Sequence, residues 1–393
     1  MGLDLPQLLT QVAQLAEETA ARADQLRRRL PAAVEALQAA SRLSEQDLAA
    51  RIERAGDRWR GALPTLEPVT ATYPPPAHPE RLHLIGADGS QILPDRHGIA
   101  SYYLINVGSL HLIHGTGLPP QGYTRPLLYF REQELYDEDQ NAISPDMIAG
   151  QRDVAEMAEL ARQAEGSSGE PTVALLDNAL LLWIALQERD HRRRQVQRVL
   201  QEYWDAMSRI RDSGAALTGF VDRPGSLGVL ALAHLASLPV ESIDPAALRA
   251  GPFRGLLDRQ LFGQILQPGY RSARFTSTSP LNREFQSVRH GIHFFYLHTG
   301  YQGQIARVEV PEWVSGSPKL LAWVHAGILE QCRLTGIPYP LIRAHELAVV
   351  AQADRHALEQ MVSVALIRAG LEPRHSQKAE TKRWTARRRR HGL

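Results

Sequence analysis

The sequence predicts an α/β protein whose mixed β-sheet is flanked by helices and preceded by an N-terminal helical arm. Apolar stretches at residues 82–93 and 99–113 flank a polar, glycine-containing segment at 94–98, a pattern typical of a β-hairpin. After residue 144, helical and strand-like patterns alternate along the chain, which is typical of α/β domains. Residues 5–63 show only helical periodicity and form the predicted arm.

Composition narrows the classes of protein that this chain can belong to. Apolar residues make up 44% of 393 residues, which permits a large core, and a net charge of +1 means that any basic footprint must be local. The single cysteine, Cys332, excludes an internal disulfide and cysteine-rich metal centres. The N-terminus lacks a secretion signal, and the longest apolar stretch, 173–186, is too short to span a bilayer. We expect a cytoplasmic protein without membrane contact.

The helical arm is predicted to cover residues 1–72. Leu8, Val12, Leu15 and Ala16 form an apolar stripe at helical spacing, and Pro31 is expected to break the helix. Ser44 and Asp47, three residues apart, resemble a capping box that starts a second helix at residue 45. An arm of this length commonly makes dimer or partner contacts. The proline-rich segment 73–79 predicts a linker, followed by a main domain at 80–370 and a basic tail at 371–393.

The main domain is predicted to alternate strands and helices. After the hairpin, the expected strands are 127–136, 172–177, 215–221, 293–297 and 305–310. The expected helices are 145–164, 188–213, one that follows residue 225 and ends at 238, 317–334, 344–353 and 354–369. Residues 115–126 and 251–280 are expected to be irregular.

Acidic residues end two of the predicted strands. Leu82, Leu84 and Gly86 share one phase of a strand, and Asp88 is the next residue in that phase. A carboxylate at the end of a buried strand is costly unless it is paired, so Asp88 either closes an Asp-Gly turn or binds a cation. Asp177 ends a second apolar strand in the same way.

Further potential ligands lie on predicted helices. Glu156 and Glu159 lie between the two aspartates, and His345 is predicted at the start of a late helix. Carboxylates suit Mg²⁺ or Mn²⁺, and an imidazole favours Mn²⁺. One or two such ions can activate water and offset charge on a phosphodiester. The order of these ligands fits a ribonuclease H-like layout, by analogy at the level of the fold.

Five short sequence motifs follow one another within residues 81–369, in this order: GADGSQ, ALLDNALL, GFVDRPGS, FFYLHTG with IARVEVPEW, and PYPLIRAHELAVV. Together they resemble the NurA nuclease family. The resemblance implies a metal-dependent DNA nuclease, both a single-stranded endonuclease and a 5′-to-3′ exonuclease, with a ribonuclease H-like core. Such proteins usually form homodimers and process DNA ends together with a hexameric ATPase, HerA.

The resemblance also implies which residues form the site. Asp88 matches the first acidic motif, Asp177 the second, and His345 the late histidine, with His298 as an alternative. Glu156 matches the helix acid best and Glu159 is a rival. These residues are expected to be catalytic and to bind Mn²⁺ or Mg²⁺.

Two features of the sequence depart from or add to the family pattern. Asn178 follows the second aspartate where the family commonly has glycine, and Arg223 stands near the place of a lysine in the archaeal branch. Arg223, Lys378, Lys382 and Arg383 are predicted to bind DNA, although a solubilising tail would also be basic. The sequence has no GxxxxGK[ST] phosphate-binding loop, so ATP hydrolysis is not expected.

Two classes of function remain open. The acids favour a nuclease that processes DNA ends. The alternative is a catalytically silent adaptor that binds DNA ends and loads a motor ATPase, which would have no use for buried acids near phosphate.

Overall fold

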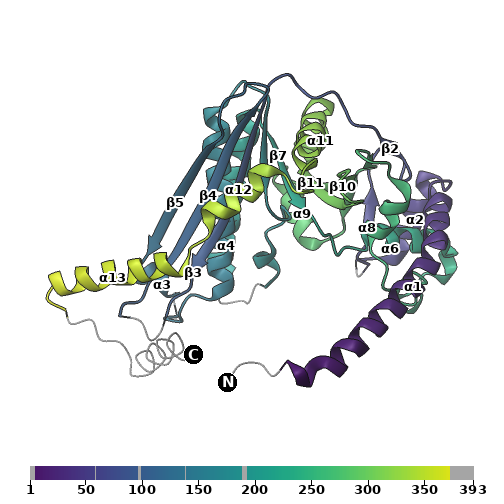
Figure 1. Cartoon of the computed structure of the whole chain (residues 1–393). Coiled ribbons are helices and arrows are strands. Elements are labelled where there is room, and N and C mark those ends of the chain that lie inside the picture. The colour runs from purple at the N-terminus through teal and green to yellow at the C-terminus, as the bar shows by residue number, and fades with distance from the viewer. Residues whose placement is uncertain (1–4, 58, 96–98, 138, 188–192, 372–393) are drawn as a thin grey trace. The chain divides into compact units, whose positions relative to one another are not determined.

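The computed structural model describes residues 5–57, 59–95, 99–137, 139–187 and 193–371. The chain divides into two compact units (Figure 1). Unit 1 comprises residues 1–77 and 220–336, and unit 2 comprises residues 78–219 and 337–393. The limits expected for the arm, main domain and tail are not tested by this division and stay predictions. No helix within the described ranges combines the length and apolar character needed to cross a membrane.

Unit 2 is built on a mixed β-sheet. Its strands are β3 (Leu82–Ile92), β4 (Tyr103–His114), β5 (Gln121–Tyr129), β6 (Thr172–Leu176) and β7 (Ala216–Val221), in the order β5-β4-β3-β6-β7. The last two residues of β7 belong to unit 1. The first three pair antiparallel, which confirms the predicted hairpin, while β6 pairs parallel to both β3 and β7. An antiparallel meander extended by parallel strands in this order is the ribonuclease H-like arrangement, so the predicted fold class is confirmed.

Helices cover both faces of this sheet. The helices of unit 2 are α3 (Glu132–Leu135), α4 (Pro145–Gly166), η2 (Trp183–Gln187), α5 (Arg193–Asp212), α12 (Tyr339–Ala348) and α13 (Gln352–Arg368). Alternate residues of β3 face opposite sides. A Cβ atom at Gly86 would lie 2.7 Å from the carbonyl oxygen of Pro340 in α12. One at Gly89 would instead lie 2.7 Å from Cγ of Arg152 in α4, so the two helices cover opposite faces.

Glycine allows α12 to lie directly on the sheet. A Cβ atom at Gly108 of β4 would lie 2.3 Å from the carbonyl oxygen of Ala344. Real Cβ atoms do not approach backbone so closely, so any side chain here would push α12 outward. The side-chain amide of Asn106 also donates to the carbonyl oxygens of Leu347 and Ala348 at 3.2 and 2.9 Å. These contacts fix the end of α12, and with it His345, against β4.

Unit 1 contains the N-terminal helices and a second group of strands. Its helices are η1 (Pro6–Leu8), α1 (Leu9–Ala40), α2 (Glu45–Ala55), α6 (Gly228–Ser237), η4 (Val240–Ser242), α7 (Pro245–Arg249), α8 (Asp258–Ile265), α9 (Pro280–Ser287), α10 (Glu312–Ser315) and α11 (Pro318–Cys332). Its strands are β1 (Ala62–Pro64), β2 (Thr72–Tyr73), β8 (Arg271–Ser272), β9 (Phe275–Ser277), β10 (Ile292–His298) and β11 (Ile305–Pro311). Phe262, Phe275, Phe294 and Tyr296 form the aromatic part of its core.

Some predicted elements were wrong. Helix α1 continues through Pro31, because Ala33, Leu37 and Ala40 beyond it are buried in the core of unit 1, and this burial opposes the cost of an interior proline of about 3 kcal/mol. Strand β5 begins at Gln121, well before the expected residue 127. The stretch 251–280, expected to be irregular, contains α8, β8 and β9. By contrast, Ser44 accepts a hydrogen bond from the Asp47 N–H and starts α2 as predicted.

Candidate active site

Asp88 and Asp177 lie at neighbouring positions where β6 ends. The parallel pairing of β3 with β6 ends where Ala87 lies opposite Leu176. The next residue on each strand is an aspartate, and the carboxyl ends of neighbouring parallel strands meet at one edge of the sheet. The expectation that the first strand ends at Asp88 was wrong, since β3 continues to Ile92 through its pairing with β4. It is β6 that ends here, and its end places Asp177 beside Asp88.

His345 completes this corner from the other side of the sheet. Its Nδ1 atom lies 2.7 Å from Oδ2 of Asp88. The side chain of Asp88 is 18% exposed and that of His345 is 62% exposed. When Asp88 is ionised, Nδ1–H is the donor, so Nε2 is the ring atom that can accept a proton. His345 lies in the last turn of α12 and not at a helix start as predicted, because Pro340 occupies the first turn and begins the helix at Tyr339.

Glu156 approaches from α4 and is buried. A Cβ atom at Gly89 would lie only 2.5 Å from Oε1 of Glu156, so the glycine after Asp88 lets this carboxylate reach the strand. Arg152 lies beside it, with Nε 3.2 Å from Oε1 of Glu156 and Nη2 2.9 Å from Oδ1 of Asp153. The resemblance to the family includes the spacing Arg152-x-x-x-Glu156, whereas no signal in the sequence marked Asp153.

Burial raises the pKa of Glu156 well above its usual range, and the neighbouring carboxylates Asp153, Asp88 and Asp177 raise it further, while Arg152 opposes the change. Burial also raises the pKa of Asp153, again against the effect of Arg152. Several carboxylates therefore share one corner of unit 2 with a single guanidinium between two of them. A cation at this corner would relieve their mutual repulsion.

Glu159, the rival to Glu156, is already held by other groups. Its Oε1 accepts hydrogen bonds from Ser109, Gln163 and Arg162 at 2.9, 2.8 and 2.6 Å. Burial would raise its pKa, but these bonds outweigh burial and lower the pKa instead. Glu159 thus has the surroundings of a structural carboxylate, whereas Glu156 lies beside the two aspartates.

The remaining predicted residues lie elsewhere. Arg223 is an exposed residue of unit 1, where the carbonyl oxygen of the preceding Asp222 accepts from Gln304. His298, also in unit 1, is buried, and its Nδ1 accepts the N–H of Gly300 at 3.1 Å. This burial lowers the pKa of His298. Lys378, Lys382 and Arg383 lie outside the described residues.

The side chains at this corner are of the types that a divalent metal ion needs as ligands. Within the described residues, no three His, Cys, Asp or Glu side chains are already arranged around one point as a metal site. The chemistry of the donors nevertheless fits, because Asp88, Asp177 and Glu156 offer carboxylate oxygens, which Mg²⁺ and Mn²⁺ prefer, and His345 offers a nitrogen. The bond to His345 uses one oxygen of Asp88, and a carboxylate has two.

Two solved structures are similar to this chain. The NurA nuclease from Sulfolobus solfataricus has a crystal structure similar to this chain, with a TM-score of 0.50 and 11% identity over 92% of this chain and 98% of that one. A structure of NurA bound to dAMP and manganese gives a TM-score of 0.40 and 12% identity, over 93% of this chain and 98% of that one. No curated protein matches the sequence.

The strand order and the acids beside the end of β6 define a protein of the ribonuclease H-like class. The family model named NurA domain matches residues 83–350, more than half of the chain. The chain therefore belongs to the NurA family, which confirms the resemblance found in the sequence. The family and the fold together support a nuclease.

Proposed function

We propose that this protein is a divalent-metal-dependent deoxyribonuclease that acts on DNA ends in the cytoplasm, cutting single strands internally and degrading them from the 5′ end. The observation that carries the proposal is the corner of unit 2, where Asp88 holds His345 at 2.7 Å beside Asp177 and the buried Glu156. A protein that only binds DNA gains nothing from acids placed near phosphate, since they repel it.

Each residue has a role in the proposed reaction. Asp88, Asp177 and Glu156 would hold Mg²⁺ or Mn²⁺, which would supply Lewis acidity toward the phosphodiester and lower the pKa of a bound water. Asp88 also orients His345, so that Nε2 can take a proton from the attacking water. Arg152 offsets the charge of Glu156 and Asp153, which keeps the carboxylates together in the folded chain.

The direct test is cleavage of end-labelled single-stranded DNA with Mn²⁺ or Mg²⁺, with and without chelator. A linear strand labelled at its 5′ end should release short labelled products, and a circular single strand should be opened. Both reactions should stop when chelator is added. Binding of DNA without cleavage under every metal condition would instead favour the silent adaptor.

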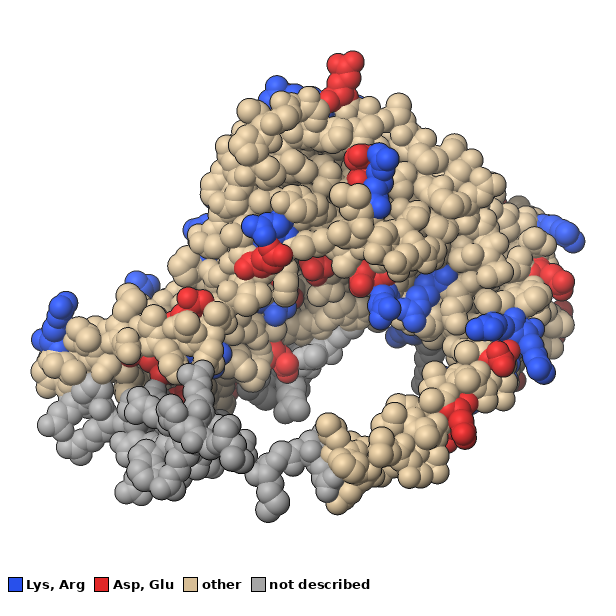
Figure 2. Space-filling model, in the orientation of Figure 1, with Lys and Arg blue, Asp and Glu red and all other residues tan. Residues whose placement is uncertain are grey.

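The DNA contacts of such an enzyme must be local. Figure 2 shows that, on the face drawn, the described Lys and Arg side chains lie among Asp and Glu side chains and do not merge into one basic surface. This distribution agrees with the net charge of +1. Arg223 and the tail residues Lys378, Lys382 and Arg383 are the DNA contacts proposed from the sequence.

Replacement of Glu156 by Gln should separate its role from that of Glu159. Folding raises the pKa of Glu156, so its protonated form favours the folded chain at low pH. This contribution to stability is lost as pH rises through the pKa of Glu156 in the folded chain. Without metal, Glu156→Gln should therefore raise the melting temperature at pH 8 and raise it less at pH 5. The pKa of Glu159 is lowered in the folded chain, so its ionised form stabilises the fold. Glu159→Gln should therefore lower the melting temperature at pH 8.

Metal binding gives a second readout for the same variants. An ion that binds only the folded chain stabilises it by about 2.7 kcal/mol when present at 100 times its dissociation constant. Mn²⁺ should raise the melting temperature of the wild type and of Glu159→Gln, and raise that of Glu156→Gln much less. Equal shifts by Mn²⁺ in the two variants would remove Glu156 from the proposed ligands.

The partners of the nuclease are proposed from helix α1. Its N-terminal half presents Leu9, Val12 and Leu15 to solvent, with exposures of 57–70%, whereas Ala33 and Leu37 of its second half are buried. Only the first half is thus available as an arm. We assign its apolar stripe to contacts with a second copy of the chain and with a HerA-type hexameric ATPase, since an unpartnered apolar stripe of this kind marks an interaction site.

The triple variant Leu9→Glu, Val12→Glu and Leu15→Glu should disrupt this contact. Association would bury these glutamates beside like charges, which is costly. The molar mass found by light scattering should therefore fall by about half, and capture of the ATPase should be lost. The control variant Thr10→Glu, Gln11→Glu and Gln14→Glu adds the same charge on the opposite face of α1. Unchanged mass and unchanged capture in the first variant would rule out the stripe as the contact.

A further inference from the structure

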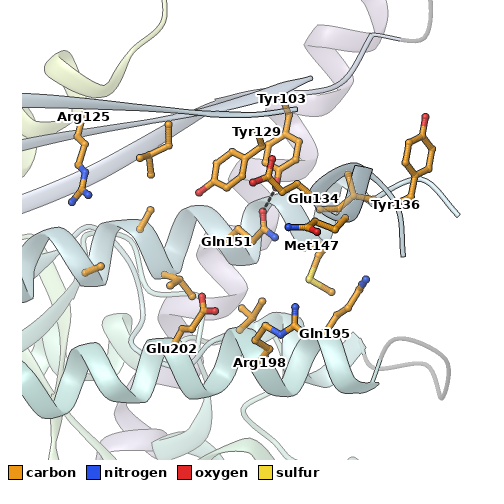
Figure 3. Close-up of a pocket in the computed structure, with 17 residues that line it drawn as sticks. Tyr103, Arg125, Tyr129, Glu134, Tyr136, Met147, Gln151, Gln195, Arg198 and Glu202 are labelled. Carbon is orange, nitrogen blue, oxygen red and sulfur yellow. Dashed lines mark hydrogen bonds between the residues drawn. The ribbon is translucent and has the colours of Figure 1, made fainter. Parts of the chain in front are cut away.

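Unit 2 contains a groove that the proposed acids do not use. It has a volume of about 390 Å³ and lies between β4, β5, α4 and α5 (Figure 3). We call it the α4 groove, after the helix that runs along it. Gln151, Ala155 and Ala158 of α4 face the groove, whereas Glu156 of the same helix faces β3. Its volume is within the range of pockets that hold small organic groups.

The floor of the α4 groove is formed by the partly exposed Tyr129, Ala155 and Ala158, and the fully buried Tyr103 supports Tyr129 from within the core. Tyr103 and Tyr129 lie directly opposite each other on β4 and β5, and their rings stack with centroids 4.5 Å apart and planes 6° apart. The Tyr103 hydroxyl donates to the side-chain amide oxygen of Gln151, which fixes the pair against α4. Ala155 and Ala158 are small, so the floor stays open beside the rings. A flat aromatic group fits such a floor.

Two arginines reach the groove from opposite sides. Arg125 projects from β5 and Arg198 from α5, and both are exposed (Figure 3). Neither forms an ion pair with an acid among the described residues. By contrast, Arg162 and Arg209 nearby are bound to Glu159 and Glu165. The rim thus carries guanidinium groups available to a ligand.

Two glutamates also line the α4 groove, and one of them is engaged. The carboxylate of Glu134 accepts the backbone N–H groups of Phe130 and Arg131, both at 2.9 Å, and so caps α3. Glu202 lies one turn beyond Arg198 on the exposed side of α5. A ligand that suits this groove therefore has aromatic groups for the floor and anionic groups that meet arginines from two sides.

The α4 groove lies on the same face of the sheet as Glu156. Gly89 pairs with Val107, and Val107 pairs with Arg125, so the three residues form one row across β3, β4 and β5. Glu156 lies over the first member of this row. Two strand spacings place Arg125 about 10 Å from Gly89. This distance is about three stacked nucleotide steps of ~3.4 Å each.

We propose that the α4 groove binds unpaired nucleotides of the DNA strand that flanks the cut, with bases on Tyr129 and the alanines of the floor and phosphates at Arg125 and Arg198. The proposal rests on the proposed nuclease function and adds a subsite to it. Stacking on protein aromatic rings requires bases with free faces, which a paired and stacked duplex does not offer. The groove is therefore a device that selects single strands.

Oligonucleotide binding tests the proposal. Fluorescence anisotropy would compare two variants in the Asp88→Asn background, so that the DNA stays intact. Arg125→Ala with Arg198→Ala should weaken binding of a 12-nucleotide oligo-dT by about tenfold or more, and lower the slope of log affinity against log salt by about 1.4. Arg81→Ala with Arg211→Ala removes the same charge outside the groove and is the matched control.

A second variant blocks the groove without changing charge. Ala158→Phe would fill part of the floor from α4, and should weaken binding of the 12-nucleotide strand by about tenfold or more. The slope of log affinity against log salt should be the same as in the Asp88→Asn parent, because no charge has been removed. Thermal melts would confirm that each variant is folded. If the arginine variant binds the long strand as tightly as its control, or if folded Ala158→Phe binds like its parent, the groove does not bind DNA. These results leave the nuclease assignment standing, whereas failure of wild type to cut any DNA would remove that assignment itself.

Discussion

Asp88→Asn should lower the rate of DNA cleavage by more than about 10³-fold while leaving the chain folded. The carboxylate of Asp88 has two tasks, and an amide can perform only the first of them. It accepts the Nδ1–H of His345 at 2.7 Å, and it faces Asp177 where β6 ends. Asparagine keeps the volume but loses the charge that a divalent ion needs. Binding of DNA should persist or become tighter, because a negative charge beside phosphate has been removed.

Cleavage would be followed on labelled single-stranded DNA, with Mn²⁺-dependent melting as a second measurement. The shift in melting temperature caused by Mn²⁺ should shrink in Asp88→Asn. Asp146→Asn, at an exposed position in the first turn of α4, is the matched control and should cut at the wild-type rate. A folded Asp88→Asn protein that turns over at the wild-type rate would refute the assignment of the site.

The parts of the fold that the sequence predicted are those with a strong local pattern. The β3–β4 hairpin, the capped start of α4 and the alternation after it all follow from periodicity and end signals within short segments. The short strands of unit 1 could not be predicted in this way. Thr72 pairs with Ser272, and Ala62 pairs with Ser277, so these strands exist through partners about two hundred residues distant. No local window contains that information.

The candidate site shows the same limit. Asp88 and Asp177 were recognisable because each follows a run of apolar residues, and parallel pairing of β3 with β6 then brings the two acids together. Helical periodicity could not decide between Glu156 and Glu159, which are both buried on one helix, and only the resemblance favoured Glu156. It depends on their neighbours across the sheet: Gly89 admits Glu156 to the corner, whereas Ser109 binds Glu159. The α4 groove likewise combines Arg125 with Arg198, which only the fold brings together.

His345 and His298, the histidines of the last two sequence motifs, should respond differently to replacement by alanine. His345 is 62% exposed and bound to Asp88, so its loss should cost little stability but lower the cleavage rate by roughly 10²-fold or more, as expected for a general acid–base or a metal ligand. His298 is buried in β10 and accepts the N–H of Gly300. Its loss should lower the free energy of unfolding by about 1–3 kcal/mol, because that N–H is left without its acceptor, and should change the rate much less.

Rates and thermal melts must be measured on both variants, because an unfolded protein gives no information about chemistry. His345→Gln provides a further distinction, since an amide can donate to Asp88 but cannot exchange a proton near neutral pH. If His345 only orients Asp88, the glutamine variant should recover most of the rate that alanine loses. If it transfers the proton, as proposed for Nε2, glutamine should be as slow as alanine. A folded His345→Ala that cuts normally, together with a folded His298→Ala that does not, would move the reaction to the strand histidine of unit 1.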